Sequence, residues 1–537
     1  MISLLGSYDR IVYNLFSWGQ LYTLLIITIQ KGGCVNIKQE TRVSGREFDV
    51  VVVGAGNAAL TAALSAREHG AKVLVLERAP YDERGGNSRY TAGAIRFAHN
   101  GLEDLLKVMP DLTEDEQKNT NFGIYSREEY FDDMARMTHF RCDPDLAEIL
   151  IDNSLDTLIW MGSKGVKFQP SYGRQAFKVD GRFKFWGGLC LETWGGGPGL
   201  IDSLLNAIQM DGIEILYNSR AMELILEKGA VRGVVVSEGT KTYDIRAKSV
   251  VLASGGFEAN TEWRTRYLGP GWDLAPVRGT RFNTGDGIRM ALDIGAVSNG
   301  NWSGCHAVGW DRNAPPFGDL AVGDGFQKHS YPLGIMVNST GRRFVDEGAD
   351  FRNYTYAKYG HEILRQPGQF AWQIFDAKVS HMLRDEYRIR QVTKVTADTI
   401  EELSKKLEDV DADTFVSEVK AFNDSVRKDV LFDPSVKDGR CTEGLDVPKS
   451  HWANPLDEPP YEAYAITCGI TFTFGGLKIN NDGQVMNSDG LPISGLYAAG
   501  ELIGGLFYFN YPGGTGLMSG AVFGRISGSS AGKDAVS

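Results

Sequence analysis

Residues 49–94, DVVVVGAGNAALTAALSAREHGAKVLVLERAPYDERGGNSRYTAGA, decide the fold of this 537-residue chain. Val50–Val53 is an unbroken apolar run, which is typical of a parallel strand covered on both faces. The next six residues, GAGNAA, fit the pattern G-x-G-x-x-A. Gly54 permits a tight turn, Gly56 lets a pyrophosphate approach the backbone, and Ala59 keeps the following helix close to the sheet.

A helix, a second strand and an acid follow this turn in order. The Ala- and Leu-rich stretch Asn57–His69 predicts a helix, which Gly70 ends, and Lys72–Leu76 predicts a strand. Glu77 closes the strand 23 positions after Gly54, where a carboxylate accepts hydrogen bonds from a ribose hydroxyl pair. We therefore predict a dinucleotide site. A tight turn without a ligand is the alternative, and the acid and both flanking strands argue against it.

The continuation GGNSRYTAGA, residues 85–94, favours FAD over NAD. Small residues there let the chain run flat against an extended flavin nucleotide. The segment resembles the flavin-contacting segment of the fumarate reductase and succinate dehydrogenase flavoprotein superfamily. Members with a covalent flavin use a histidine where this chain has Ser88-Arg89-Tyr90, so the resemblance implies non-covalent FAD.

Composition limits the partners and the compartment. Hydrophobic residues make up 42% and charged residues 23%, which is ordinary for a globular protein with room for two domains. The net charge of −12 argues against a nucleic-acid partner, and an anionic substrate requires a local cluster of cations.

The cysteines are widely scattered, at 34, 142, 190, 305, 441 and 468. None of the spacings matches a haem, iron–sulfur or zinc site, so we predict no metal and reduced thiols in a cytoplasmic protein. Electrons that reach the flavin then require a separate acceptor. The superfamily resemblance implies a membrane-associated iron–sulfur protein in that role.

Residues 1–45 do not match the rest of the chain. Ile11–Gln30 carries no charge and is about long enough to span a bilayer, although polar residues dilute it. One interpretation is a peripheral membrane anchor. The other, which we prefer, is a mis-assigned start, with the folded protein beginning near Val35.

The strand and helix rhythm divides the remaining chain. It breaks down over Asn301–Pro459 and resumes with the strand Gly495–Ala499 and a glycine-preceded closing helix over Leu517–Ile526. We predict an α/β protein with a Rossmann-like FAD-binding domain of the glutathione-reductase-like dinucleotide fold and an inserted α+β capping domain. The predicted divisions are an N-terminal extension (1–45), the FAD domain (46–300 and 460–537) and the cap (301–459).

A basic and aromatic stretch precedes the cap. Over Tyr172–Trp186, Arg174, Lys178, Arg182 and Lys184 alternate with aromatic residues. This pattern fits a hairpin that faces the cleft, and it fits an edge hairpin with a polar face equally well.

The superfamily resemblance also implies an activity. Its members oxidise or reduce the C–C bond between two carboxylated carbons: a hydride moves between substrate and flavin, and a cap arginine moves the proton. That arginine follows a G-x-R-F-x-x-E run, here residues 341–347, and the next arginine is Arg352, one position later than usual. His306 resembles the histidine that holds a substrate carboxylate, and we expect His329 to share this role.

Two superfamily cations are replaced. Thr471-Phe472 stands where a histidine is expected, and Tyr511 stands where an arginine is expected, which argues against a plain fumarate reductase. Tyr511 in Tyr-Pro-Gly resembles 3-ketosteroid dehydrogenases. Residues 348–354 and 507–512 look most like tricarballylate dehydrogenases, as do residues 262–271 and 468–476.

The interpretation we follow is therefore an FAD-dependent dehydrogenase of a tricarboxylate or dicarboxylate, most simply tricarballylate to cis-aconitate. Arg352 would accept the proton, His306 and His329 would hold carboxylates, and Tyr511 would donate a hydrogen bond. The alternatives are a ketosteroid desaturase that uses Tyr511, a fumarate or succinate oxidoreductase, and a flavin subunit that only relays electrons.

The motifs and the resemblance together nominate a set of FAD contacts. Near Asn283–Gly287, the start of a helix adds Asp286 to the set. The complete set is Gly54, Gly56, Asn57, Ala58, Glu77, Arg78, Gly86, Asn87, Ser88, Thr91, Ala92, Gly93, Ala221, Ser254, Gly255, Asp286, Gly500, Glu501, Gly516 and Leu517.

Overall fold

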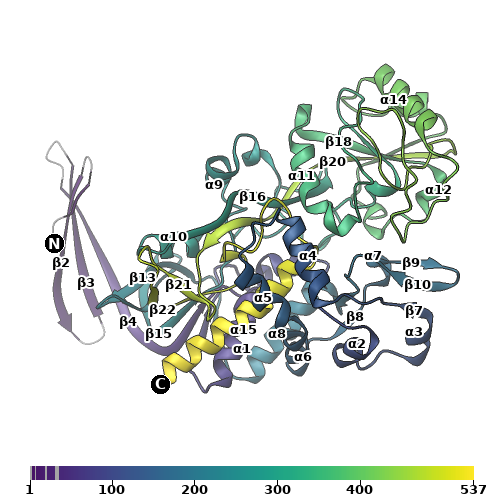
Figure 1. The fold of residues 1–537 in the computed structure, drawn as a ribbon. Coiled ribbons are helices and arrows are strands. Elements are labelled where there is room, and N and C mark those ends of the chain that lie inside the picture. The colour runs from purple at the N-terminus through teal and green to yellow at the C-terminus, as the bar shows by residue number, and fades with distance from the viewer. Residues whose placement is uncertain (1–2, 6–7, 19–20, 31–34) are drawn as a thin grey trace.

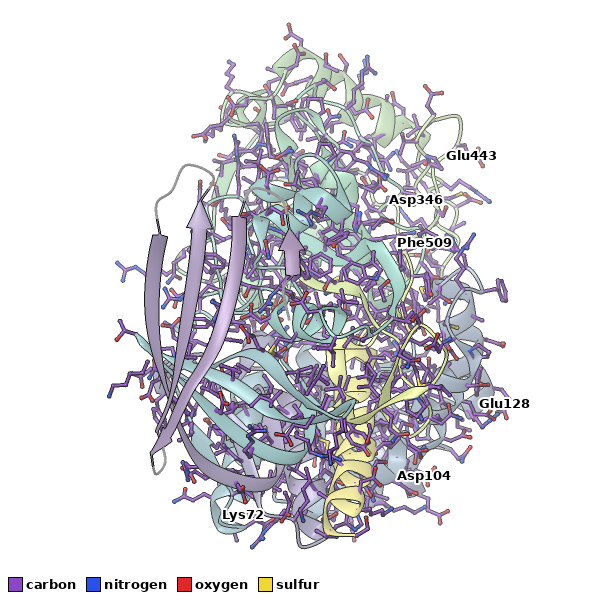
Figure 2. The ribbon with its side chains drawn as sticks, turned by 90° about the vertical axis from the view of Figure 1, so that its left-hand side faces the viewer. Lys72, Asp104, Glu128, Asp346, Glu443 and Phe509 are labelled. Atoms are coloured by element: carbon purple, nitrogen blue, oxygen red, sulfur yellow. The ribbon has the colours of Figure 1, made fainter. Side chains whose placement is uncertain are left out.

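A computed structural model describes residues 3–5, 8–18, 21–30 and 35–537, with side chains from residue 46 onward. A large domain holds an eleven-stranded sheet, and a cap with its own sheet stands over one end of it (Figure 1). In the side view the cap, with Glu443 and Asp346, lies at the opposite end of the molecule from Lys72 of the large domain (Figure 2).

The centre of the large domain is a parallel sheet in the spatial order β12, β5, β4, β15, β22. Its strands are β4 (Val35–Val53), β5 (Val73–Leu76), β12 (Glu214–Leu216), β15 (Lys241–Leu252) and β22 (Pro492–Ala498). Val50–Val53 is buried at the middle of this sheet, as an apolar run requires. The predicted strand–turn–helix–strand unit is therefore present.

Antiparallel strands extend this sheet on both sides. They are β1 (Ser3–Leu5), β2 (Tyr8–Trp18), β3 (Leu21–Gln30), β13 (Arg220–Glu227), β14 (Ala230–Glu238) and β21 (Gln484–Met486). β3 pairs with residues 35–43 of β4, and β2 and β3 project away from the body of the molecule (Figure 1). The anchor and mis-assigned-start interpretations concern side chains that lie outside the described residues.

Three helices cover one face of the parallel sheet: α1 (Asn57–Glu68), α8 (Gly196–Met210) and α15 (Thr515–Val536). The prediction that the closing helix ends at Ile526 is wrong, because α15 continues for ten more residues. Gly524, Gly528 and Gly532 do not stop the helix. They face α1 so closely that a Cβ atom on Gly528 would lie 2.1 Å from the backbone oxygen of Ala62.

Shorter helices form the surface beside the sheet. They are α2 (Leu102–Val108), α3 (Glu114–Asn119), α4 (Arg127–Met137), α5 (Pro144–Asp152), α6 (Ser154–Ser163), α9 (Thr261–Trp263) and α10 (Asp286–Leu292). Among the described residues, no helix combines the length and the apolar character needed to cross a membrane.

The cap is a five-stranded sheet with helices packed on it. Its elements are β16 (Ser298–Asp311), β17 (Ile335–Val337), β18 (Phe370–Phe375), β19 (Lys394–Ala397), β20 (Tyr461–Leu477), α11 (Tyr356–Leu364), α12 (Ala377–Ser380), α13 (Ile400–Ser404) and α14 (Ala412–Ser425). β16 and β20 pair antiparallel along their length and run from the large domain into the cap. The predicted boundaries at 301 and 459 fall within β16 and just before β20.

A small basic segment, residues 168–185, lies under the cap, and we call it the arm. It contains β8 (Phe168–Pro170), α7 (Tyr172–Gln175), β9 (Ala176–Val179) and β10 (Arg182–Phe185). β9 and β10 form an antiparallel hairpin, and β10 also pairs with β7 (Thr120–Asn121). The arm belongs to neither of the two large sheets.

Candidate active site

One continuous cavity extends from the start of α1 to the underside of the cap. Every residue nominated above as an FAD contact lines it except Gly93, and so do Arg352, Tyr511, His306 and His329. Gly93 lies behind the lining, where its Cβ atom would meet the Thr193 hydroxyl at 2.2 Å. We call the two parts of the cavity the nucleotide end and the substrate end.

The glycines of the G-x-G turn have different structural roles. Gly54 has φ +112°, and a Cβ atom there would lie 2.4 Å from the backbone oxygen of Ala253. Gly56 has an ordinary extended backbone, with φ −81°, and a Cβ atom there would meet nothing closer than 3.6 Å. Gly54 therefore permits the fold, and Gly56 leaves open space in which a ligand can approach the backbone.

Two helices begin at this end without a capping side chain of their own. α1 starts after Gly56, and α15 starts after Gly514. The Asn57 amide donates to the backbone oxygen of Leu517 at 2.8 Å, which holds the two helix starts together. Helix N-termini favour negative charge, so this arrangement suits a pyrophosphate and an electron-rich ring system.

Glu77 lies buried at the end of β5. Its carboxylate accepts a hydrogen bond from the Ala79 backbone N–H at 2.7 Å. Burial raises the pKa of Glu77 to about 7. A pair of ribose hydroxyls would donate to the ionised form and replace the solvation that burial removes.

The carboxylate of Asp286 is ion-paired with two arginines. Arg78 donates to one of its oxygens at 2.9 Å, and Arg220 binds both oxygens at 2.7 and 2.8 Å. Asp286 therefore fixes two guanidinium groups at the cavity wall. The open space at Gly56, the helix starts and buried Glu77 together fit the phosphates and ribose of FAD.

Two acids, Glu258 and Glu501, support the nucleotide end of the cavity. Glu258 accepts hydrogen bonds from the amides of Asn87 and Asn283, each at 2.6 Å, and both amides line the cavity. Burial and the neighbouring Glu501 raise the pKa of Glu258 well above its ordinary value. The raised pKa favours the protonated form of Glu258, which holds Asn87 and Asn283 in place.

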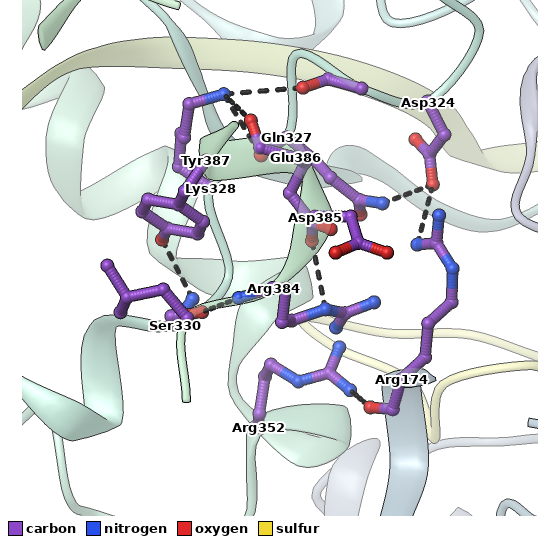
Figure 3. Close-up of polar contacts among 12 residues, drawn as sticks. Arg174, Asp324, Gln327, Lys328, Ser330, Arg352, Arg384, Asp385, Glu386 and Tyr387 are labelled. Atoms are coloured by element: carbon purple, nitrogen blue, oxygen red, sulfur yellow. Dashed lines mark hydrogen bonds and ion pairs between the residues drawn. The ribbon is translucent and has the colours of Figure 1, made fainter. Parts of the chain in front are cut away.

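The substrate end is rich in arginine. Arg174, Arg278, Arg352 and Arg384 line it (Figure 3 shows all but Arg278). Asp324 pairs with Arg278 at 2.7 Å, and Glu386 pairs with Arg384 at 2.9 Å. Arg174 also lies 3.7 Å from Asp324, so four guanidinium groups share two carboxylates and leave an excess of two positive charges.

Arg352 is the arginine of this group that has no carboxylate partner among the described residues. It begins the short 3-10 turn Arg352–Tyr354, and its Nη2 donates to the backbone oxygen of Arg174 at 2.6 Å. No carboxylate of the described residues lies within ion-pair distance of it. Burial, and then the neighbouring Arg384, lower the pKa of Arg352 to about 9. Its neutral form is therefore far more accessible than that of an arginine in water.

The two histidines lie at the same end as neutral rings. His306 and His329 are both buried, and each packs edge-on against the ring of Tyr356. Burial lowers their pKa values well below the usual range, and so does the nearby positive charge of Arg278 for His306 and of Arg352 for His329. Both ring nitrogens of His306 and Nε2 of His329 lack a hydrogen-bond partner among the described residues. These atoms are available to bind a substrate.

Tyr511 completes the wall opposite the arginines. Its hydroxyl shares a 2.5 Å hydrogen bond with the hydroxyl of Tyr356, and burial raises its pKa, so it remains a neutral donor. Its ring packs against Phe472 and His306 at 5.2 and 5.0 Å. The positions where the superfamily pattern expects cations thus form an aromatic wall.

Several residues of the substrate end were not predicted. Arg278, Asp324, Tyr356 and Arg384 stand in loops and helices without a recognisable local motif. The basic pattern around Arg174 was a usable signal, and the structure combines both interpretations of it. Arg174 lines the cavity, while Lys178 and Arg182 are exposed on the hairpin.

Comparison with known proteins adds to this geometry. Residues 49–517 match the FAD binding domain family. A probable fumarate reductase of Shewanella frigidimarina is 32% identical over 91% of this chain and 75% of its own length. A 3-oxosteroid 1-dehydrogenase of Mycolicibacterium smegmatis is 26% identical over 90% of this chain and 97% of its own length.

A solved structure gives the same result for the fold. The open conformation of a flavocytochrome c3 fumarate reductase is 29% identical, with a TM-score of 0.68 over 92% of this chain and 79% of that one. The predicted α/β fold with a capping domain is confirmed, and so is FAD as the cofactor.

Proposed function

We propose that this chain, which belongs to the FAD binding domain family and to the fumarate reductase and succinate dehydrogenase flavoprotein superfamily, converts tricarballylate to cis-aconitate. An FAD-dependent oxidoreductase of this family acts on a C–C bond, and the finer choice of substrate is our inference. The observation that carries it is the excess of two positive charges at the substrate end, where Arg174 and Arg278 share Asp324 and Arg352 has no carboxylate partner among the described residues.

The substrate is a polyanion that restores charge balance at this end. Tricarballylate has two carboxylated carbons joined by the bond to be oxidised, together with a third carboxylate on a short arm. Three carboxylates at this end would balance the charges of Arg174 and Arg352 and would give hydrogen-bond partners to the unpartnered ring nitrogens of His306 and His329.

Oxidation of the C–C bond removes a hydride from one carbon and a proton from its neighbour. Bound FAD supplies the acceptor for the hydride. Arg352 takes the proton, because its pKa of about 9 makes the neutral guanidine available near physiological pH. The carboxylate next to the leaving proton lies against donors that stabilise the charge that develops there.

Tyr511 binds and orients in this proposal. Its hydroxyl donates to a substrate carboxylate, and Tyr356 fixes its direction through their shared hydrogen bond. The same hydroxyl pair is the observation that favours a ketosteroid desaturase as a second candidate, with Tyr511 polarising a ketone. Arg352 argues against that candidate, since an apolar steroid would leave a buried cation unpaired.

The proposed reaction also requires a separate electron acceptor. Among the described residues, no group of three or more histidine, cysteine or acidic side chains could hold a metal. We therefore propose transfer to an external partner, such as a membrane-associated iron–sulfur protein. Rapid turnover of the purified chain with dissolved oxygen or NAD alone would contradict this part of the proposal.

The test is an anaerobic titration of the yellow holoenzyme. Tricarballylate should bleach the flavin absorbance, succinate should do so less efficiently, and a 3-ketosteroid should have no effect. Bleaching by the steroid and not by the carboxylates would replace the proposal with the second candidate.

A further inference from the structure

We propose that Arg174, contributed by the arm, selects substrates that carry a third carboxylate. This inference rests on the proposed function and assigns a role to a residue outside both the cap and the FAD-binding sheet. Arg174 would bind the carboxylate on the substrate's side arm, away from the bond that is oxidised.

The position of Arg174 is fixed through its backbone. Its carbonyl oxygen accepts the 2.6 Å hydrogen bond from Arg352, and its N–H donates to the backbone oxygen of Ser171. The next residue, Gln175, is buried and lines the same cavity. The arm is therefore anchored beside the proposed proton acceptor, so that its side chain reaches into the cavity from a defined place.

The guanidinium of Arg174 is available for a ligand. It makes no side-chain hydrogen bond to any residue that the structure describes, and 29% of the side chain is exposed. Its ion pair with Asp324 is long, at 3.7 Å, and leaves room for a ligand carboxylate to compete. Asp324 is already bonded by Arg278 at 2.7 Å and by Gln327 at 2.5 Å, so most of its charge is compensated.

The direction of the Arg174 side chain places its guanidinium group away from that of Arg352. Figure 3 shows the Arg352 guanidinium at the backbone of Arg174, whereas the Arg174 guanidinium extends away toward Asp324. The two cations thus lie at different places in the cavity. A substrate that satisfies both must carry a carboxylate at a distance from its reacting carbons, as the carboxymethyl arm of tricarballylate does.

Gln175 gives this subsite a second unsatisfied polar group. Its side chain is 4% exposed, and its Oε1 has no hydrogen-bond partner among the described residues. An unpaired buried amide oxygen is costly unless a ligand or water supplies a donor. The arm therefore presents both a charged and an amide group to the contents of the cavity.

The experiment compares Arg174→Gln with Arg182→Gln in the holoenzyme. Arg182 lies in the same arm on the exposed hairpin, so its variant controls for the loss of one positive charge from the segment. We expect Arg174→Gln to raise KM for tricarballylate at least about tenfold, the scale of one charge-assisted hydrogen bond, with kcat within about twofold. KM for succinate, which lacks the arm, should not change, and Arg182→Gln should leave both substrates unaffected.

Equal KM increases for both substrates, or no increase for tricarballylate, would overturn the inference. Arg174→Lys keeps the charge and should recover part of the affinity, which guards against a folding defect in the Gln variant. If the wild type oxidises no carboxylate, a flavin difference-spectrum titration separates the claim about the Arg174 subsite from the claim about the reaction. Tricarballylate binding that Arg174→Gln abolishes would retain the subsite and reject the reaction, and absence of binding would reject both.

Discussion

The two ends of the cavity use different parts of the chain for recognition. At the nucleotide end, backbone N–H groups, glycine positions and Glu77 come largely from one contiguous stretch. At the substrate end, side chains from the arm, the loop before the cap and four cap segments meet in space. A backbone site depends on local conformation, which neighbouring residues specify. A site made of charged side chains depends on how distant segments pack.

The largest expected effect separates chemistry from cofactor binding. Arg352→Gln and Arg352→Lys should retain FAD but slow anaerobic flavin reduction at least about a hundredfold, the usual scale for a positioned acid–base group. Lysine keeps the charge but loses the planar fork. Stopped-flow absorbance measures the rate, and Arg365→Gln, at an exposed residue just after α11, is the control. Normal reduction in Arg352→Gln together with none in Tyr511→Phe would favour the ketosteroid candidate.

The next prediction tests whether the open space at Gly56, in the nucleotide end of the cavity, receives the pyrophosphate of FAD. A Cβ atom at Gly56 meets no atom closer than 3.6 Å and the backbone is compatible with a side chain, so the Gly56→Val apoprotein should fold with an unchanged melting temperature. Its side chain would occupy the approach of the pyrophosphate, which should lower FAD affinity about ten- to a hundredfold. Fluorescence titration of the apoprotein with FAD measures this loss. Gly54→Ala, in contrast, should impair folding, and full FAD affinity in Gly56→Val would place the pyrophosphate elsewhere.

Glu77 should make FAD binding depend on pH. In the ligand-free protein its pKa is about 7, so below pH 7 the carboxyl is protonated and must lose its proton to accept from both ribose hydroxyls. FAD affinity should therefore fall by up to about tenfold for each pH unit below 7 and level off above it. Glu77→Gln should bind about tenfold more weakly at pH 8 and show little pH dependence. A wild-type affinity that is flat from pH 5.5 to 8 would exclude this role.

The smallest expected effect lies at the aromatic wall. Tyr511→Phe removes one neutral donor and leaves the ring packing with Phe472 and His306. KM for tricarballylate should rise about two- to tenfold, while most of the turnover at saturation remains. Steady-state kinetics with an artificial electron acceptor measures both constants. A large loss of kcat would show that the hydroxyl takes part in the chemical step.

The same contrast explains how much the sequence could predict. The FAD-binding unit was predictable from residues 49–94, because the strand, the glycine turn and Glu77 act within a short span. The end of α15 was not predictable, because its late glycines look like helix stops until the packing against α1 is known. Arg278 and Arg384 have no local signature, and only the meeting of their loops gives them a common function.

Tyr511 and Phe472 were predictable only in part. The sequence identified both as departures from a superfamily pattern, which located a change in the substrate end. It could not show which other segments bring cations to the substrate end, since Arg174 and Arg384 lie far along the chain from Phe472 and Tyr511. The meeting of such distant segments is a property of packing.

The paired strands β16 and β20 have a consequence for protein engineering. They pair from Ser298 with Leu477 to Asp311 with Ile466, with register shifts after Asn301 and after His306, so the chain departs from the large domain and returns at adjacent points. Residues 312–465 therefore form a cassette with both of its splice points on neighbouring strands. A cap from another protein whose ends have the same spacing can be grafted there while the cofactor-binding sequence stays intact. Libraries of such chimaeras would vary the part of the substrate pocket that residues 312–465 supply, while the flavin site stays constant.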